Sequence, residues 1–352
     1  MNLQSKANWH SRELALYGTT CEEIIKWVNY FQLEVNQRLA YVDASHAEGN
    51  LEVSIGITTH ENHFLLQEET GLDQTVLQEF DGALVNGNHH AASNQIIFVN
   101  LEKEKSLIKR SAELTNVLAI VLPQGMTEVP AFVQLLLQPE TKIFMLKEDV
   151  LEFVSTFFEE APLKALILLG GKSSRMGEEK GLIQYHEKTQ AEHLLLLLEE
   201  LGLEVFLSVR EEQKENYAFL KRPFITDQIQ GAGPLGGISS AMRSLPQTAL
   251  LVVACDLPNL QKEQLEFLLK KRNAKAFATC YASPLDGGPE PLCSIYEPKS
   301  FSALMKVWAS GKSCPRKMLF NRTVEILSIQ DSRFLMNANT PEERQQLLDS
   351  KI

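Results

Sequence analysis

Short apolar runs alternate with helix-period stretches along the whole chain, a pattern typical of α/β proteins. Apolar positions three and four apart predict helices near residues 20–31, 103–114, 127–137 and 148–159. The second half opens with a strand at 164–169 and continues as strand, helix and strand to its end. In the first half, apolar runs predict strands over residues 12–17, 39–43, 51–58, 81–86, 95–100, 117–122 and 142–146.

The helix and strand pattern breaks where Glu159, Glu160 and Ala161 precede Pro162. Proline disfavours a helical conformation for the residue before it, so one helix should end here and a new unit begin. The length of 352 residues is about twice that of a usual single domain. We therefore predict two three-layer α/β domains, residues 1–160 and 161–352.

Composition narrows the class of protein. The net charge of −11 argues against a bulk electrostatic grip on nucleic acid or an anionic membrane, although a small basic pocket for a phosphate remains open. No apolar run approaches the ~18 residues that a membrane span needs, and the N-terminal residues lack the apolar core of an export signal. The five cysteines form no CxxC pair, which fits reduced thiols. We expect a cytoplasmic protein.

A glycine-rich loop gives the strongest chemical signal. The apolar strand ALILL runs into Gly170 and Gly171, and hydroxyl-bearing and basic residues follow, among them Arg175 and Lys180. Exposed amides at such a turn can bind an anion, and the two cations can hold phosphate oxygens. The loop is not a Walker P-loop, because GxxxxGK[ST] does not occur in it. A solvated basic turn between a strand and a helix would have the same composition.

Two aspartates follow predicted strands in the same half. Asp256 ends the strand of ALLVVACDLP, where an α/β sheet binds ligands and where one carboxylate with substrate phosphates can hold Mg²⁺. The alternative is that Asp256 caps a helix near residue 260. Asp227 leads into GAGPLGGI, a rigid turn before a helix that allows close contact with a ligand.

Five segments in this order resemble the molybdenum cofactor guanylyltransferase family: LLGGKSSRMGEEKG, FITD…GPLGGI, VVACDLP, EPLCSIYEP and NANTPEE. The resemblance covers essentially all of residues 163–352. It implies a Rossmann-like nucleotidyltransferase sheet of the glycosyltransferase-A type. It also implies transfer of GMP from GTP to the phosphate of molybdopterin, with release of pyrophosphate and formation of the guanine dinucleotide. Molybdoenzymes or their chaperones would be downstream partners.

The resemblance also implies roles for single residues. Lys180 and Arg175 would stabilise the phosphates, and Asp256 would bind Mg²⁺ as the metal ligand and catalytic carboxylate. The residues that would bind the nucleotide or acceptor are Leu168, Leu169, Gly170, Gly171, Lys180, Ser208, Asp227, Gly233, Pro234, Leu235 and Asn339. The chain departs from the family pattern at Leu169 and Glu179, where alanine and aspartate are usual, and at Ser208, a position that can carry a base-contacting asparagine. These departures concern base recognition more than the reaction.

Three further readings of the second half stay open. A related transfer that uses CTP or a sugar phosphate would need the same loop and metal aspartate, and a non-catalytic binding protein could retain both. The segment NANTPEE forms a capping box around Thr340, and it can also place Asn339 near the acceptor. Lys312, Arg316 and Lys317 either meet the acceptor phosphate or form a solvated surface.

The first half has the outline of a nucleotide-binding domain without its lysine. A strand runs into Gly18-Thr19-Thr20 and a helix, which resembles the P-loop of GTP-binding adaptor proteins that partner the guanylyltransferase, in a degenerate form. Asp43, His46 and His89 fall at predicted strand ends, so they could converge on a metal or a pterin phosphate. Six of the eight histidines lie within residues 1–90, and dispersed surface histidines are the alternative. The domain would dock the partner or deliver the acceptor.

Overall fold

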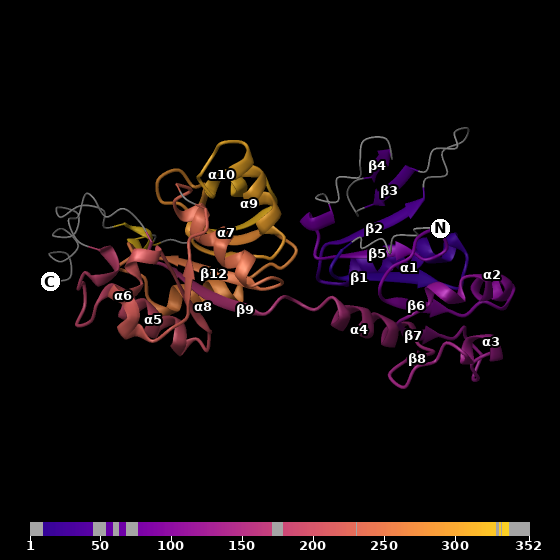
Figure 1. The fold of residues 1–352 in the computed structure, drawn as a ribbon. Coiled ribbons are helices and arrows are strands. Elements are labelled where there is room, and N and C mark those ends of the chain that lie inside the picture. The colour runs from indigo at the N-terminus through magenta and orange to yellow at the C-terminus, as the bar shows by residue number, and fades with distance from the viewer. Residues whose placement is uncertain are drawn as a thin grey trace. The chain divides into compact units, whose positions relative to one another are not determined.

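The structure is a computed structural model, and it describes residues 10–44, 54–58, 63–67, 77–170, 179–229, 231–328, 331 and 333–337. The chain divides into two compact units, Met1–Glu160 and Ala161–Ile352 (Figure 1). Each unit contains one sheet and its own hydrophobic core.

The sheet of the N-terminal unit has the strand order β4-β3-β2-β5-β1-β6-β7-β8. The strands β2, β5, β1, β6, β7 and β8 pair in parallel, and β3 and β4 extend one edge as antiparallel strands. Their bounds are β1 (Glu13–Tyr17), β2 (Leu39–Ala44), β3 (Ser54–Thr58), β4 (His63–Gln67), β5 (Gly82–Asn86), β6 (Gln95–Phe98), β7 (Val117–Val121) and β8 (Lys142–Phe144).

Helices cover both faces of this sheet. Alternate residues of β1 point to opposite faces, because side chains alternate along a strand. Leu14 and Leu16 join a cluster with residues of α1 and α4, whereas Ala15 and Tyr17 join a cluster with residues of α2 and α3. The helices are α1 (Cys21–Glu34), α2 (Glu104–Lys109), α3 (Ala131–Gln134) and α4 (Lys147–Phe157).

Two of the predicted helices are shorter in the structure, and one strand was not predicted. The expected helix at 103–114 ends at Lys109, because the chain turns to bring the amide of Asn116 to Gln95 Oε1 (2.8 Å) at the start of β7. The expected helix at 127–137 is reduced to α3, since Pro130 excludes the residue before it from the helix. Strand β4 has a short apolar run between polar residues and gave no clear signal.

The C-terminal unit has the strand order β11-β10-β9-β12-β14-β13-β15. The first four strands in this order are parallel, and β14 is antiparallel to both of its neighbours. The strands are β9 (Leu163–Leu168), β10 (Val205–Val209), β11 (Phe224–Thr226), β12 (Ala249–Ala254), β13 (Ala278–Ala282), β14 (Pro289–Tyr296) and β15 (Val324–Leu327). This is the α/β sheet with a parallel core that the sequence predicts for the C-terminal half.

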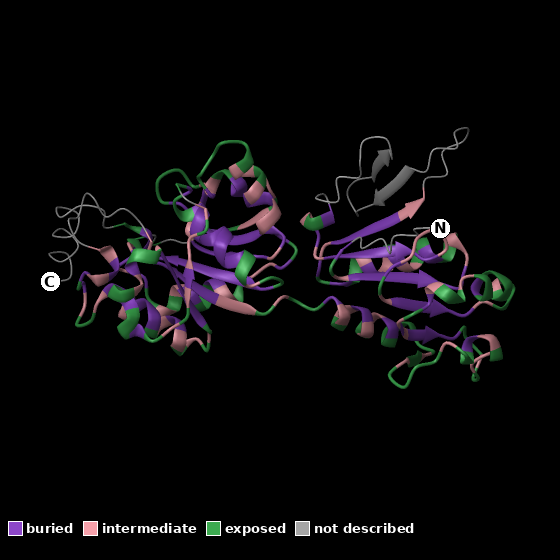
Figure 2. Ribbon diagram, in the orientation of Figure 1, coloured by how far each residue is buried: buried purple, intermediate pink, exposed green. Residues whose placement is uncertain are grey.

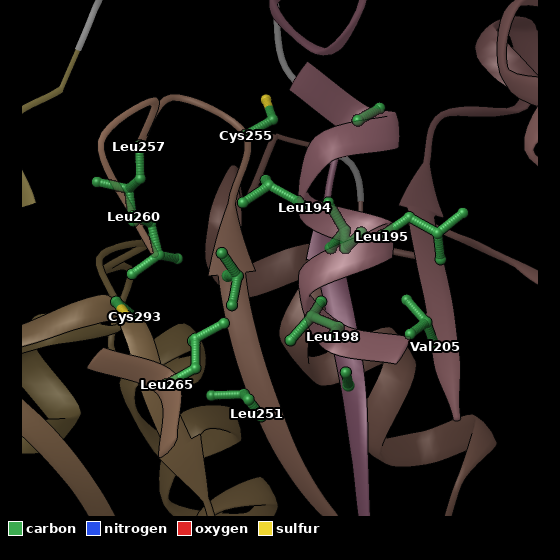
Figure 3. Packing of buried hydrophobic residues seen from close by; sticks show 14 of the residues in the cluster. Leu194, Leu195, Leu198, Val205, Leu251, Cys255, Leu257, Leu260, Leu265 and Cys293 are labelled. Atoms are coloured by element: carbon green, nitrogen blue, oxygen red, sulfur yellow. The ribbon is translucent and has the colours of Figure 1, made fainter. Parts of the chain in front are cut away.

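Hydrophobic layers flank this second sheet on both faces. One cluster joins β9 and β12 to α5 and α8, and the other joins them to α7, α9 and α10. Figure 2 shows the buried strands between more exposed helices, and Figure 3 shows the leucines of α5 packed beside β12 and β10. The helices are α5 (Gln190–Glu200), α6 (Lys214–Tyr217), α7 (Pro234–Ser244), α8 (Lys262–Lys270), α9 (Ser300–Ala309) and α10 (Arg316–Phe320).

Candidate functional site

The carboxyl ends of β9 and β12 form the switch point of the second sheet. From β9 the chain continues to β10 and β11 on one side, and it then returns to β12 on the other side. Ligands of open α/β sheets bind at such a point, outside the carboxyl ends of the strands. The residues after β9 and β12 are Leu169 and Gly170 on one strand and Cys255 and Asp256 on the other.

Lys180 and Asp256 come together at this switch point. The Nζ atom of Lys180 lies 3.3 Å from Asp256 Oδ2, and the two side chains keep 24% and 16% of their exposure. Lys180 opens a short 3-10 turn that ends at Leu182, and Gly181 fits there because a Cβ atom would lie 2.7 Å from the hydroxyl of Tyr217. The structure therefore places a cation and a carboxylate, both reachable by solvent, where a phosphate chain can bind.

The second carboxylate oxygen of Asp256 has the surroundings expected of a metal ligand. Asp256 Oδ1 is buried, and among the residues that the structure describes no group donates a hydrogen bond to it. Such an atom is costly to bury unless a partner arrives, and carboxylate oxygens are the ligands that Mg²⁺ prefers. No three His, Cys, Asp or Glu side chains are grouped to hold a metal within the described ranges, so most ligands would come from substrate phosphates and water. Asp256 is not a helix cap, because α8 begins at Lys262 with Gln261 as its cap.

Ser208 and Asp227 form a second polar group beside the end of β9. The Ser208 hydroxyl donates to Asp227 Oδ1 (3.0 Å), and the Ser208 carbonyl accepts from the amides of Leu169 (2.9 Å) and Gly170 (3.0 Å). Burial raises the pKa of Asp227, while this hydrogen bond and the charge of Arg210 act in the opposite direction. The pair presents a partly desolvated hydrogen-bond acceptor next to the glycine turn.

The start of α7 packs against this pair. A Cβ atom on Gly237 would lie 2.5 Å from Ser208 Oγ and 3.2 Å from Asp227 Oδ1, so only glycine fits. Gly233 caps the helix with a φ of 56°, and Pro234 is its first residue. The side chain of Leu235 is fully buried in the core, so its backbone alone can face a ligand.

Leu168 and Leu169 are also mostly buried. Their exposed fractions are 7% and 4%, and their side chains belong to the two core clusters on opposite faces of the sheet. Contacts of this segment with a ligand would therefore use mainly backbone atoms and Gly170. A Cβ atom on Gly170 would lie 3.4 Å from Asp227 Oδ2, which shows how closely the turn approaches the carboxylate.

Glu290 is a site residue for which the sequence analysis assigned no role. It is the second residue of β14, and it lies three residues before Cys293, whose partner Val253 on the antiparallel strand β12 lies three residues before Asp256. Burial raises the pKa of Glu290, and the negative charges of Asp256 and Asp286 raise it further, while Arg316 opposes them. The signal was available in the sequence as the acidic residue that opens the segment EPLCSIYEP.

The remaining predicted residues lie outside the described residues, are exposed, or make other contacts. Gly171, Arg175 and Asn339 lie outside the described residues, and so does the capping segment around Asn339. Lys312 and Lys317 are exposed. Arg316 forms an ion pair with Asp286 and donates to the carbonyl of Pro289 (2.9 Å).

In the N-terminal unit, two of the three predicted strand-end residues meet. His89 Nδ1 lies 2.5 Å from Asp43 Oδ1, and both side chains are largely buried. His46 lies outside the described residues. Among the described side chains, His10 accepts a hydrogen bond from the backbone amide of Arg12, and the ring of His90 packs edge-on against that of His89. No described helix is long and apolar enough to cross a membrane.

Comparison with known proteins places these features in a family context. Residues 165–326 match the MobA-like NTP transferase domain. A probable molybdenum cofactor guanylyltransferase of Carboxydothermus hydrogenoformans is 32% identical over 193 residues, which are 53% of this chain and 95% of that protein. A molybdenum cofactor biosynthesis bifunctional protein of Synechocystis sp. is 32% identical over 188 residues, which are 53% of this chain but only 54% of that protein. A crystal structure of molybdopterin-guanine dinucleotide biosynthesis protein A from Archaeoglobus fulgidus is 23% identical, with 54% of this chain and 100% of that chain covered and a TM-score of 0.46.

Proposed function

Since the chain belongs to the molybdenum cofactor guanylyltransferase family, we propose that it transfers GMP from GTP to the phosphate of molybdopterin. Pyrophosphate leaves, and the product is the guanine dinucleotide of the cofactor. The matched residues lie in the C-terminal unit, so this unit carries the activity. The observation that carries the proposal is the Lys180–Asp256 pair at the switch point of the second sheet.

The reaction needs alignment and charge neutralisation more than a base. The acceptor phosphate is already anionic, so its oxygen can attack the α-phosphorus of GTP while the bond to pyrophosphate breaks. Lys180 would stabilise the charge on the phosphates, and Arg175 would act with it. Asp256 would hold Mg²⁺ through its unpaired Oδ1 atom, and the ion would supply charge neutralisation for the phosphates when bound.

Nucleotide binding would use the other side of the β9 end. Asp227 accepts hydrogen bonds, and Ser208 holds its carboxylate in place. N–H groups of the base or hydroxyl groups of the ribose are suitable donors to this carboxylate. The backbone around Leu168, Leu169 and Gly170, with the start of α7 at Gly233, Pro234 and Leu235, would close around the nucleotide. Asn339 would contribute on the acceptor side.

For the N-terminal unit we propose a degenerate P-loop-like adaptor that docks a partner or delivers the acceptor. The loop after β1 contains only Gly18, Thr19 and Thr20 and has no lysine. The side-chain amide of Asn88 donates to the Thr19 carbonyl (2.9 Å), and Thr20 caps α1 through the amide of Glu23 (3.2 Å). Asn88 and the first turn of α1 thus already use hydrogen-bonding groups of this loop, which a P-loop would offer to a nucleotide. Molybdoenzymes or their chaperones are the proposed partners.

All five cysteines of the chain are free. We place the reaction in the cytoplasm, where GTP is available and thiols stay reduced.

A nucleotide panel tests the proposed reaction. The protein is incubated with molybdopterin, Mg²⁺ and one of GTP, CTP or ATP, and pyrophosphate release is measured. We expect GTP to be the preferred substrate by kcat/KM. Preference for CTP, or activity with a sugar phosphate in place of molybdopterin, would contradict the proposed substrates. No release with any nucleotide would favour a non-catalytic binding protein.

A further inference from the structure

Three reactive side chains meet at the carboxyl edge of the N-terminal sheet. Cys21 is the first residue of α1 and follows β1 after a three-residue loop, and Asp43 lies near the end of β2. His89 follows β5, which pairs in parallel with both β1 and β2. The carboxyl ends of these three neighbouring strands therefore bring a thiol, an imidazole and a carboxylate to one place.

The contacts between them run in a single chain. Cys21 Sγ lies 3.7 Å from His89 Nε2, and the other ring nitrogen of His89, Nδ1, lies 2.5 Å from Asp43 Oδ1. Asp43 is itself fixed, because Tyr41 donates its hydroxyl to Oδ2 (2.7 Å) and the Ala44 amide donates to Oδ1 (2.8 Å). A proton on His89 Nδ1 would be held by Asp43, which leaves Nε2 to accept the proton of the thiol. A nucleophile, a base and a group that orients the base stand in the order that nucleophilic catalysis requires.

A helix N-terminus and a hydrogen-bond donor surround the sulfur. Cys21 is at the N-terminus of a 14-residue helix, where the helix dipole stabilises a negative charge. The side-chain amide of Asn88 donates to Cys21 Sγ (3.6 Å). Burial alone would raise the pKa of Asp43, but hydrogen bonds from His89 and Tyr41 outweigh it and lower this pKa, so the carboxylate is ionised near neutral pH.

Accessibility separates Cys21 from the structural cysteines of the chain. Cys255, Cys280 and Cys293 are buried, and burial raises the pKa of Cys255 and Cys280 to about 12. Cys21 is only partly buried, and the side chain of His89 keeps 22% of its exposure. A small electrophile can therefore reach the sulfur.

We propose that Cys21, His89 and Asp43 form a second active site, which takes the acyl group of an ester or thioester. His89 removes the thiol proton, and Cys21 Sγ forms a bond to the carbonyl carbon. The bond from this carbon to the alcohol or thiol breaks, and His89 returns the proton to that leaving group. Water then attacks the acyl–cysteine with His89 as base, which releases the carboxylic acid and restores the thiol. No oxidant or reductant takes part.

Backbone amides near the sulfur can stabilise the oxyanion of this step. The first amides of a helix have no helical acceptor, and those of Cys21 and Glu22 occupy these positions in α1. The amide of Glu23 is already used, since it donates to the Thr20 side chain. Two donors beside the nucleophile form the kind of oxyanion hole that acyl transfer requires.

Native alkylation of the full chain tests the reactivity of Cys21 without any substitution. Iodoacetamide is added over a range of pH, and the modified cysteines are quantified by peptide mass mapping. Cys314 is the matched control, because it is exposed and no histidine contacts it among the residues that the structure describes. We expect Cys21 to react at least about tenfold faster than Cys314 at pH 7. Equal rates for the two cysteines would overturn the proposal.

Variants separate the roles of the three groups. In His89→Ala, the alkylation rate of Cys21 should fall to that of Cys314. Asp43→Asn should lower the alkylation rate of Cys21 at pH 7, because the positioning residue no longer holds the ring of His89 through Nδ1. Tyr41 contacts Asp43, His90 packs edge-on against His89, and Tyr17 and Arg110 act on His90; all four are unchanged in both variants. Folding of each variant is checked by urea unfolding. An unchanged alkylation rate of Cys21 in folded His89→Ala would contradict the role of His89 as the base.

A chromogenic ester tests acyl transfer itself. With p-nitrophenyl acetate, the wild-type chain should release a burst of nitrophenolate and carry one acetyl group on the Cys21 peptide. Cys21→Ser should lose the thioester adduct, and Cys314→Ser should retain it. An acetyl group found only on lysines, or a burst that persists in Cys21→Ala, would overturn the proposal. The assay contains no nucleotide, so its outcome is independent of guanylyl transfer.

Discussion

Lys180 and Asp256 show how single residues of the C-terminal unit divide their tasks. The ion pair holds both side chains at the ends of β9 and β12, and neither side chain is fully buried. We therefore expect substitutions here to change the reaction much more than the fold.

Lys180→Ala should lower kcat for dinucleotide formation by about 10²–10³-fold, because a positive charge beside the reacting phosphates is lost. Lys262→Ala is the control, since this exposed lysine of α8 forms only surface ion pairs with Glu200 and Glu266. Steady-state kinetics with GTP and molybdopterin measure the effect. A Lys180→Ala enzyme with the kcat of the Lys262→Ala enzyme would contradict the role of Lys180.

Glu290 makes a prediction about pH and stability. Its pKa is raised above the ordinary value of 4.5, first by burial. The stabilisation from its protonated form is therefore present below this ordinary value and is lost as the pH rises through the folded-state pKa. The free energy of unfolding of the wild type, relative to Glu290→Gln, should decrease between about pH 4 and pH 7. Urea unfolding at several pH values measures it, and a difference that grows with pH would show that the charged form is favoured.

The positions of the site residues could be predicted from the sequence only in part. Asp256 and Asp227 follow apolar strands, so their place at the carboxyl edge could be predicted. The pairing of Ser208 with Asp227, and the approach of Glu290 to Asp256, depend on which strands become neighbours. That order is set by tertiary packing, which the local pattern does not contain.

At the scale of elements, α7 packs closely against the end of β9 and the Ser208–Asp227 pair. Its glycines allow the helix to approach β9 and β10 closely, and Gly237 is the contact point with Ser208 and Asp227. The hydrophobic pattern predicts the helix, and the steric need for glycine at this position appears only in the structure.

Gly237→Ala should destabilise the protein by about 1–3 kcal/mol and weaken GTP binding, because a methyl group would collide with the Ser208 hydroxyl. Ser239→Ala on the same helix is the control. The Ser239 hydroxyl is buried without a hydrogen-bond partner among the described residues, so its removal should be neutral or slightly stabilising. Thermal unfolding and calorimetry of GTP binding measure both variants. If Gly237→Ala had the same stability and the same GTP affinity as Ser239→Ala, the close packing at Gly237 would contribute to neither property.

A comparison of the predicted and observed helices and strands shows which of them the local hydrophobic pattern determines. Long apolar runs such as those of β9 and β12 are predicted well, because burial on both faces requires them. The helices α2 and α3 are shorter than predicted, since helical periodicity continues past residues that turns and prolines remove from the helix. Element existence follows from periodicity, and element ends follow from specific contacts.

At the scale of the whole molecule, each unit has a separate sheet and separate core clusters. The boundary lies between Glu160 and Ala161. The relative from Carboxydothermus hydrogenoformans is covered over 95% of its length by a match to about half of this chain. The family match lies within residues 165–326, so the N-terminal unit falls outside it.

A fragment of residues 161–352 should fold and retain the guanylyl transfer activity of the full chain within about threefold, because its core and its site lie within one unit. Circular dichroism and pyrophosphate release measure the two properties. Acceptor capture at low molybdopterin concentration should be weaker in the fragment if the N-terminal unit delivers the acceptor. A folded fragment without activity would assign part of the active site to the N-terminal unit.

The most direct test of the account is the mass of the product. The full chain is incubated with Mg²⁺, GTP and molybdopterin, and the guanine dinucleotide is sought by mass spectrometry in the wild type and in Asp256→Asn. We predict the dinucleotide with the wild type, a loss of at least about 10²-fold in its rate with Asp256→Asn, and an unchanged rate with the exposed control Asp331→Asn. Absence of the dinucleotide with the wild type, or an equal rate with folded Asp256→Asn, would contradict the account.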